Sequence, residues 1–223
     1  MKKAILPLLL IALLIGACGG GIRVHIEKKN YETDRLTVSA EIPQISGMKH
    51  TDLQDTINNQ YKTDIDGWIA QIQTEADENP SSNPYELVVT QSIKTNKDGF
   101  LSMVSEVYRY TGGAHGTTAW LAKNIDDNAG KVITLADLFA DEDYKTVLNR
   151  IMQQMVEEHP EQYGDLWEKP IIGEEQGFYI ENKRLVIYYP PYELSYYARG
   201  FVEFPIALKD IETYLNPEYK FLA

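Results

Sequence analysis

Histidine is the side chain best suited to acid–base chemistry and metal binding near neutral pH, and this chain contains four of them. They are widely separated, at His25, His50, His115 and His159, and no two lie three or four residues apart. A zinc site on one helix would need such a spacing, as in the His-Glu-x-x-His pattern. The sequence therefore predicts no catalytic metal and no cofactor.

Signatures of other active sites are also missing. The sequence has no Gly-x-Ser-x-Gly nucleophile elbow, no Walker loop and no Rossmann fingerprint. Acidic pairs such as Glu174 and Glu175 have the residue type that a glycosidase uses, but 33 acidic residues create such pairs by chance. We expect a non-enzymatic protein, with a cell-wall hydrolase or deacetylase as the less favoured alternative.

A glycine-rich segment at 111–116 surrounds one of the histidines with small residues. Gly112, Gly113 and Gly116 permit positive φ angles and close backbone approach. His115 can lie at the rim of a binding site as a donor or ligand, or it can hydrogen-bond the loop itself. We favour the structural interpretation, in which the glycines let two strand ends turn tightly.

A second segment, 190–200, displays tyrosines after two prolines. Tyr192, Tyr196 and Tyr197 offer apolar area with a polar tip, and a stiff aromatic loop loses little entropy on binding. In the alternative interpretation these rings pack over the edge of a sheet. The sequence leaves both possibilities open for the three tyrosines.

Periodicity predicts the elements that position these loops. Period-two alternation indicates strands, which we expect at 22–29, 35–42, 85–96, 100–110, 117–126, 131–133, 177–182, 185–189 and 201–206. Apolar stripes of period 3.6 predict long helices over 50–78 and 144–156, and a short closing helix over 208–214. The fold class is therefore α+β, with a mainly antiparallel sheet and two long helices packed on it. We expect two intimately associated subdomains, 22–126 and 127–223.

The first seventeen residues are typical of a secretory signal peptide. Lys2 and Lys3 form a positive start, 5–15 is an apolar run, and Gly16 and Ala17 are small. The apolar run is about half of the ~20 residues that a membrane-spanning helix needs. We expect cleavage after Ala17.

The residues around this cleavage site resemble the bacterial lipobox, an aliphatic residue and two small ones before a cysteine. The resemblance implies that Cys18, the single cysteine of the chain, is acylated and becomes the new N-terminus. Glycines in 18–21 would then form a flexible spacer. We expect an envelope lipoprotein outside the cytoplasm, with the membrane as a partner through the lipid on Cys18.

The net charge of the whole chain is −12, and loss of the leader lysines makes the remainder more negative. Such a surface repels nucleic acid, so we expect no nucleic-acid partner. The charge would attract a cationic protein, although solubility alone is a sufficient reason for it.

Two motifs resemble a widespread bacterial extracytoplasmic domain of unknown function. They are residues 108–116 with the helix start at 134–139, and residues 191–200 ahead of the last strand. The domain occurs in RsiV-type anti-sigma factors, whose ectodomain binds lysozyme, and in the non-catalytic N-terminal region of PdaC-type peptidoglycan deacetylases. The resemblance covers roughly residues 22–215.

This resemblance implies a fold and a binding surface. RsiV-type sensors add a cytoplasmic segment and a membrane span, and PdaC-type enzymes add a metal-binding catalytic domain. We see neither in this sequence and expect neither signalling output nor catalysis. The resemblance implies a basic protein such as lysozyme, or a peptidoglycan fragment, as the ligand. A structural envelope lipoprotein without a specific ligand is the alternative.

Overall fold

The computed structural model describes residues 21–223, so the predicted leader and Cys18 lie outside the described residues. The chain forms two compact units. The first contains residues up to Ser92 together with 105–119, and the second contains 93–104 together with 120–223. The boundary expected at 126/127 therefore falls inside the second unit, because three long strands each contribute residues to both units.

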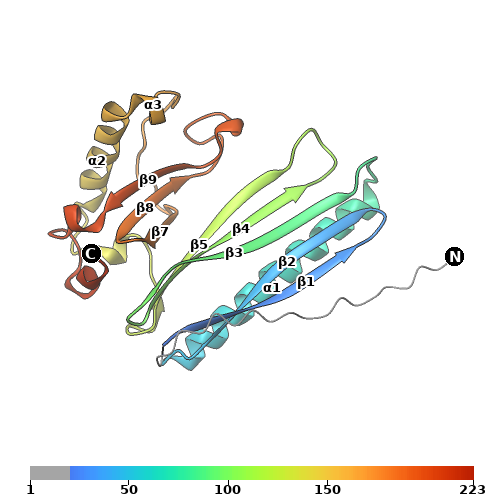
Figure 1. The fold of residues 1–223 in the computed structure, drawn as a ribbon, viewed down its shortest axis with the longest axis horizontal. Helices are drawn as coiled ribbons and strands as arrows, with labels where there is room; N and C mark the ends of the chain where they lie inside the picture. Colours follow the sequence, from blue (N-terminus) through green and yellow to red (C-terminus); the bar gives the residue numbers. More distant parts are fainter. Residues whose placement is uncertain (1–20) are drawn as a thin grey trace. The chain divides into compact units, whose positions relative to one another are not determined.

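The first unit is built on a strand–helix–strand arrangement (Figure 1). β1 (Arg23–Glu32) and β2 (Leu36–Ser46) form an antiparallel hairpin. α1 (Thr51–Glu78) then carries the chain along the sheet, and β3 (Tyr85–Lys97) pairs with β2 in parallel. A parallel pair needs such a long crossover, because both of its strands must start at the same end.

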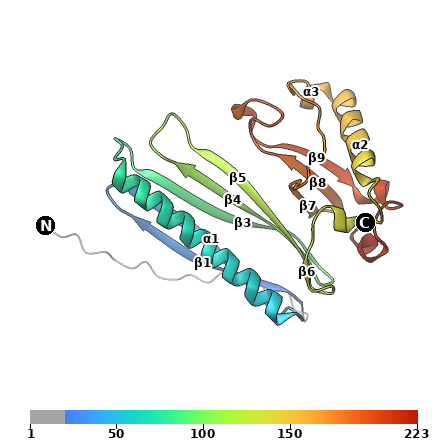
Figure 2. The ribbon, with the colours of Figure 1, turned by 180° about the vertical axis from the view of Figure 1, so that it is seen from behind.

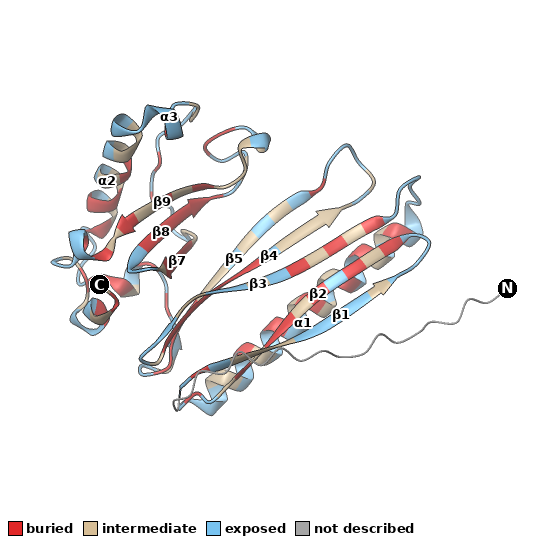
Figure 3. Cartoon of the chain, viewed as in Figure 1, coloured by how far each residue is buried: buried red, intermediate tan, exposed pale blue. Residues whose placement is uncertain are grey.

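α1 lies along one face of these strands, as Figure 2 shows from behind. Its buried residues recur every three or four positions and so form one stripe: Ile57, Tyr61, Ile65, Ile69, Ile72 and Ala76. The last four of them share a cluster with inward-facing residues of β2 and β3, among them Leu36, Val38, Ala40, Leu87 and Val89. The outer side of the helix is exposed (Figure 3). The stripe predicted from the sequence is therefore the core of this unit.

Three further strands complete a six-stranded sheet in the order β1 to β6. They are β4 (Phe100–Tyr110), β5 (Thr117–Asp126) and β6 (Lys131–Val132). The turn between β3 and β4 has positive φ at both central residues, Asp98 (51°) and Gly99 (83°). This is the Asp-Gly hairpin turn that the sequence predicts, because its twist matches that of the flanking strands.

The second unit contains a separate three-stranded antiparallel sheet in the order β7–β8–β9. Its strands are β7 (Phe178–Glu181), β8 (Arg184–Tyr189) and β9 (Val202–Ala207). α2 (Tyr144–Glu158) packs on one face of this sheet and is followed by the short α3 (Pro160–Tyr163). Four 3₁₀ turns complete the unit: η1 (Ala136–Leu138), η2 (Tyr197–Arg199), η3 (Leu208–Ile211) and η4 (Pro217–Leu222).

Side chains of β8 alternate between two apolar clusters, as expected for a strand that is covered on both faces. Leu185 and Ile187 share a cluster with Met152 of α2. Val186 and Tyr188 lie in the opposite cluster, together with Val104 of β4. The three-stranded sheet is thus the middle layer of the second unit.

A buried polar network joins the free edge of β7 to the ends of β4 and β5. The Ser102 hydroxyl donates to Oδ1 of Asn124 (2.6 Å) and accepts from the Ile180 amide (3.0 Å). The Asn124 side-chain amide donates to the Phe178 carbonyl (3.0 Å). An edge strand presents unpaired backbone groups that cannot be buried without partners. These two side chains therefore replace a missing neighbouring strand.

The structure confirms the α+β class with a mainly antiparallel sheet that the sequence predicts; it adds one detail and corrects two. The six-stranded sheet is mixed, because β2 and β3 pair in parallel, and each long helix packs on a different sheet. The predicted closing helix at 208–214 is the 3₁₀ turn η3, followed by η4. Alternation along a strand reports which side is buried, but it does not report the direction of the neighbouring strand.

Candidate functional site

The glycine loop at 111–116 belongs to the first unit, and two of its glycines have a clear structural role. Gly112 has φ +83°, and a β-carbon there would lie 2.6 Å from Cβ of Ser81. A β-carbon on the buried Gly116 would lie 2.5 Å from Cζ of Tyr108. Gly113 has no positive φ, and an added β-carbon would meet only the His115 carbonyl oxygen at 4.0 Å. Gly113 therefore shows neither of the two features, positive φ or a close neighbour, that call for glycine at Gly112 and Gly116.

His115 is exposed, and its Nδ1 lies 2.9 Å from the Gly116 carbonyl oxygen. An Nδ1–H therefore donates to the loop's own backbone. Among residues 21–223, no group of three or more His, Cys, Asp or Glu side chains is arranged to hold a metal ion. His115 and the three loop tyrosines belong to different units.

Substitutions at Gly112 and Gly113 are expected to have different effects on stability. Gly112→Ala places a side chain at positive φ and against Ser81, and should lower the free energy of unfolding by about 1–3 kcal/mol. Gly113→Ala should change it by less than about 0.5 kcal/mol. Thermal unfolding of the two variants measures the difference. Equal losses would show that the loop's conformation differs from the one described.

The loop at 190–200 belongs to the second unit and is held to the segment 162–167 by several hydrogen bonds. The buried Leu194 accepts from the Trp167 amide (3.0 Å), and the Ser195 hydroxyl donates to the Asp165 carbonyl (3.1 Å). Arg199 forms an ion pair with the Asp165 carboxylate and also donates to the Gln162 carbonyl. The loop therefore has a defined conformation, as the two prolines suggested.

Three exposed aromatic residues and the half-buried Tyr197 form a surface on this loop and its support, which we call the aromatic surface: Trp167, Tyr192, Tyr196 and Tyr197. Trp167, Tyr192 and Tyr196 are 54%, 61% and 49% exposed. The Tyr192 and Tyr197 rings are 5.6 Å apart. Trp167 was not among the residues predicted from the sequence, because it lies in a segment without periodicity.

The backbone of Tyr192 is strained, with φ +72° in a residue that has a β-carbon. Such a conformation costs on the order of 1–3 kcal/mol and persists only where surrounding contacts fix it. Here the Tyr192 amide donates to the Ser195 carbonyl at 3.0 Å. The backbone that carries the exposed ring is therefore held in a conformation that tyrosine rarely adopts.

Charge also couples the loop to its support. Burial alone would raise the pKa of Asp165, but hydrogen bonds from Arg199 and Tyr196 hold it below its ordinary value. The same hydrogen bond with Asp165 raises the pKa of the exposed Tyr196. Burial raises the pKa of Glu193, which lies next to Tyr192. At neutral pH the Asp165 carboxylate is charged and holds two residues of the loop.

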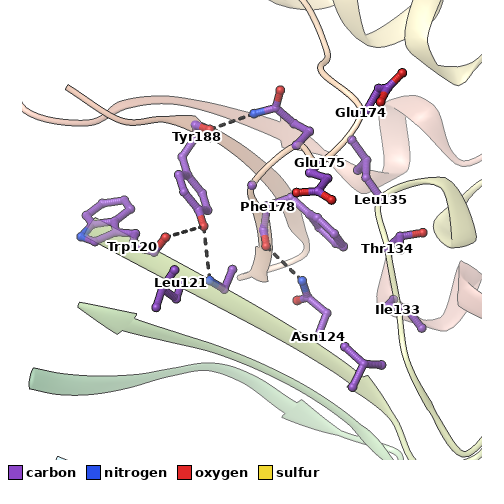
Figure 4. Close-up of a pocket in the computed structure, with 14 residues that line it drawn as sticks. Trp120, Leu121, Asn124, Ile133, Thr134, Leu135, Glu174, Glu175, Phe178 and Tyr188 are labelled. Carbon is purple, nitrogen blue, oxygen red and sulfur yellow. Dashed lines mark hydrogen bonds between the residues drawn. The ribbon is translucent and has the colours of Figure 1, made fainter. Parts of the chain in front are cut away.

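A pocket of about 500 Å³ lies within the second unit (Figure 4). Its walls come from β5, from the segment 132–135 that begins at the end of β6, and from the segment 174–178 that ends at the start of β7. Tyr188 projects toward β5, where its hydroxyl donates to the Trp120 carbonyl (3.1 Å) and accepts from the Ala122 amide (3.2 Å). The acidic pair singled out in the sequence, Glu174 and Glu175, lines this pocket.

One Ser-x-x-Lys spacing, a pattern found in acyl-transfer enzymes, is present at Ser46 and Lys49. Ser46 is the last residue of β2 and Lys49 lies in the connection to α1, so the two do not share a helix face. Neither residue lines the pocket. The geometry gives this pair no nucleophilic arrangement.

Comparison with known proteins finds a family match in each half of the chain. Residues 29–118 match the family described as deacetylase PdaC, and residues 136–209 match the protein family of unknown function DUF3298. The anti-sigma-V factor RsiV of Bacillus subtilis is 26% identical over 199 residues, which cover 78% of this chain and 64% of that protein. The match thus spans less than two thirds of the relative. These findings confirm the resemblance inferred from the two loop motifs.

Solved structures share the fold. A DUF3298 family member from Bacteroides fragilis has a TM-score of 0.70 and 19% identity, over 90% of this chain and 96% of its own. A DUF3298 family protein from Pseudomonas aeruginosa has a TM-score of 0.64 and 13% identity, over 88% and 94% of the two chains. At these identities the likeness establishes the architecture alone.

Proposed function

We propose that this chain, which carries the PdaC-type region and the DUF3298 domain of the RsiV-like extracytoplasmic family in that order, is a non-enzymatic binding protein of the bacterial cell envelope. The observation that carries the proposal is the aromatic surface. Three of its four rings are exposed, yet the loop beneath them is fixed by hydrogen bonds and an ion pair. Exposed aromatic residues on a rigid support are the usual anchors of protein interfaces.

The ligand that we favour is a basic protein such as a lysozyme. The net charge of −12 would speed encounter with a cationic partner, and the effect would weaken as salt is added. A peptidoglycan fragment is the other ligand suggested by the resemblance. Tyrosine and tryptophan rings suit a glycan as well as a protein. The residue types of the surface therefore do not distinguish the two ligands, and an experiment must.

Calorimetric titration with a basic lysozyme, at low and at physiological salt, tests this proposal. Tyr192→Ala and Tyr196→Ala should each weaken binding by on the order of 2 kcal/mol, about thirtyfold, if these residues are anchors. Ile93→Ala removes a similarly exposed apolar side chain (42% exposed) and should have no effect. Binding that disappears at physiological salt, or that ignores both tyrosines, would favour an envelope lipoprotein without a specific ligand.

A deacetylase is the second candidate, because residues 29–118 match the family named for one. The named relative, by contrast, is an anti-sigma factor, which is a regulatory protein. Our proposal requires that the purified protein releases no acetate from acetylated peptidoglycan or chitooligosaccharides. Stoichiometric zinc together with acetate release would support the deacetylase.

Membrane attachment through lipid on Cys18 is a further part of the proposal. In the described part of the chain, no helix is both long and apolar enough to cross a bilayer. Cys18→Ser removes the thiol that would carry the lipid, so the variant should move from the membrane fraction to the soluble fraction. Stable anchoring takes two or more acyl chains, and the variant would lack the chain on the thiol. Fractionation with carbonate extraction measures this. A variant that stays with the membranes would exclude the lipid anchor.

A further inference from the structure

The pocket beside β5 has a rigid, preformed floor. The Tyr188 ring is fixed at its hydroxyl by the backbone of Trp120 and Ala122. The backbone carbonyl of Tyr188 accepts a hydrogen bond from the Gln176 side chain at 2.9 Å. A β-carbon on Gly177 would lie 2.5 Å from Cζ of this ring, so only glycine permits the arrangement. The polar atoms of the floor are therefore satisfied within the protein.

The surface that remains for a ligand is largely aliphatic. Leu121 and Val132 are exposed large apolar residues, and Ile133, Leu135 and Phe178 are among the other apolar residues of the lining. A volume of about 500 Å³ lies within the range of pockets that hold small ligands, which are lined mainly by apolar side chains with a few polar groups. The pocket thus suits a ligand with an apolar stem.

The charge at the pocket is entirely negative. Glu174 and Glu175 are exposed, and neither forms a hydrogen bond or ion pair with another residue of the described chain. No lysine, arginine or histidine is among the fourteen lining residues. In Figure 4, Glu175 lies beside Phe178, and Glu174 lies farther out, beyond Leu135. A cationic group at this pocket would therefore meet carboxylates that have no partner within the described chain.

We propose that this pocket binds a short basic segment of a partner polypeptide, with the methylene stem of a lysine or arginine against the aliphatic lining and its charged end at Glu174 and Glu175. Long basic side chains bury an apolar stem while the charge stays at the surface, which matches the order of apolar and acidic groups here. This site uses none of the residues of the aromatic surface. It is therefore independent of the binding proposed for that surface.

Amide-resolved NMR titration of the lipid-free chain with acetyl-Leu-Lys-Leu-amide tests the proposal. We expect saturable shifts of the Leu121, Ala122, Val132 and Ile133 amides. Acetyl-Leu-norleucine-Leu-amide, which lacks the charge, and acetyl-Leu-Glu-Leu-amide should bind at least fivefold more weakly. The double variant Glu174→Gln/Glu175→Gln should weaken binding of the lysine peptide about fivefold, as expected for exposed ion pairs.

The matched control is Glu157→Gln/Glu158→Gln at the end of α2, which changes the net charge equally at residues that do not line the pocket. It should leave the affinity unchanged. Equal weakening by both double variants, shifts centred on other residues, or no saturable shift with any peptide would overturn the proposal. Tyr192→Ala should not alter peptide binding, so failure of the aromatic surface as a binding site would leave this result intact.

Discussion

Asn124→Leu is expected to lower the free energy of unfolding by about 3 kcal/mol. Asn124 is 2% exposed, and its side chain joins the Ser102 hydroxyl to the Phe178 carbonyl. Leucine has a similar volume but cannot form hydrogen bonds. Each buried polar group left without a partner costs about 1–3 kcal/mol, and two such groups would lose their partner here. The effect should exceed that of any exposed substitution described above.

Chemical denaturation measures this loss, with Asn59→Leu on the exposed side of α1 as the control. The control should change stability by less than about 0.5 kcal/mol. Ser102→Ala combined with Asn124→Leu should cost clearly less than the sum of the two single changes, because both residues belong to one network. Additive losses, or a loss below 1 kcal/mol for Asn124→Leu, would show that the network does not fix the edge of β7.

The main elements of the fold could be predicted because their signals are local. The apolar stripe at 50–78 identified α1, and the Asp98-Gly99 pair identified the β3–β4 turn. The network around Asn124 could not be predicted in this way. Its partners come from strands far apart in the sequence, and an asparagine near the end of a strand gives no sign of burial. The parallel pairing of β2 and β3 was missed for a similar reason.

The residues of the candidate sites also differ in whether a local signal in the sequence identified them. The tyrosines of 190–200 stood out because their type and spacing are unusual next to two prolines. Trp167 joins them only through contacts with Leu194 and Glu193 in the folded chain. The pocket combines three segments, and only its acidic pair attracted attention in the sequence. Likewise, sequence alone does not distinguish Gly112, which needs a positive φ, from Gly113, which does not.

Strain and support act together in the aromatic surface. Tyr192 holds a positive φ, while Asp165 and Arg199 fix the segment that follows it. Order that is imposed in the free protein need not be acquired on binding, so the entropy cost of association falls. The rigidity of this loop is therefore as relevant to affinity as the area of its rings. A residue that presents no aromatic group to a partner should therefore also affect affinity, provided that it holds the loop.

Arg199→Ala is expected to weaken binding of a basic partner about tenfold, although it removes none of the rings of the aromatic surface. The variant removes the ion pair with Asp165 and the hydrogen bond to Gln162, so the loop must be ordered on binding. Because the lost charge is positive, simple attraction to a cationic partner would instead strengthen binding slightly. The two explanations therefore predict opposite signs. Calorimetry should also show a less favourable entropy, and Arg199→Lys should restore part of the affinity.

Because the pKa of Asp165 is lowered, the stability that this carboxylate contributes to the loop depends on pH. An acid whose pKa is depressed in the folded protein contributes stability above its unfolded value of about 3.9, and this contribution is lost as pH falls through the lower folded value. The stability difference between the unmodified protein and Asp165→Asn should therefore be constant above about pH 5 and vanish in stronger acid. Thermal unfolding of the two proteins from pH 2 to pH 7 measures it. A difference that persists at pH 2, or that grows there, would mean that the charge of Asp165 does not hold the loop.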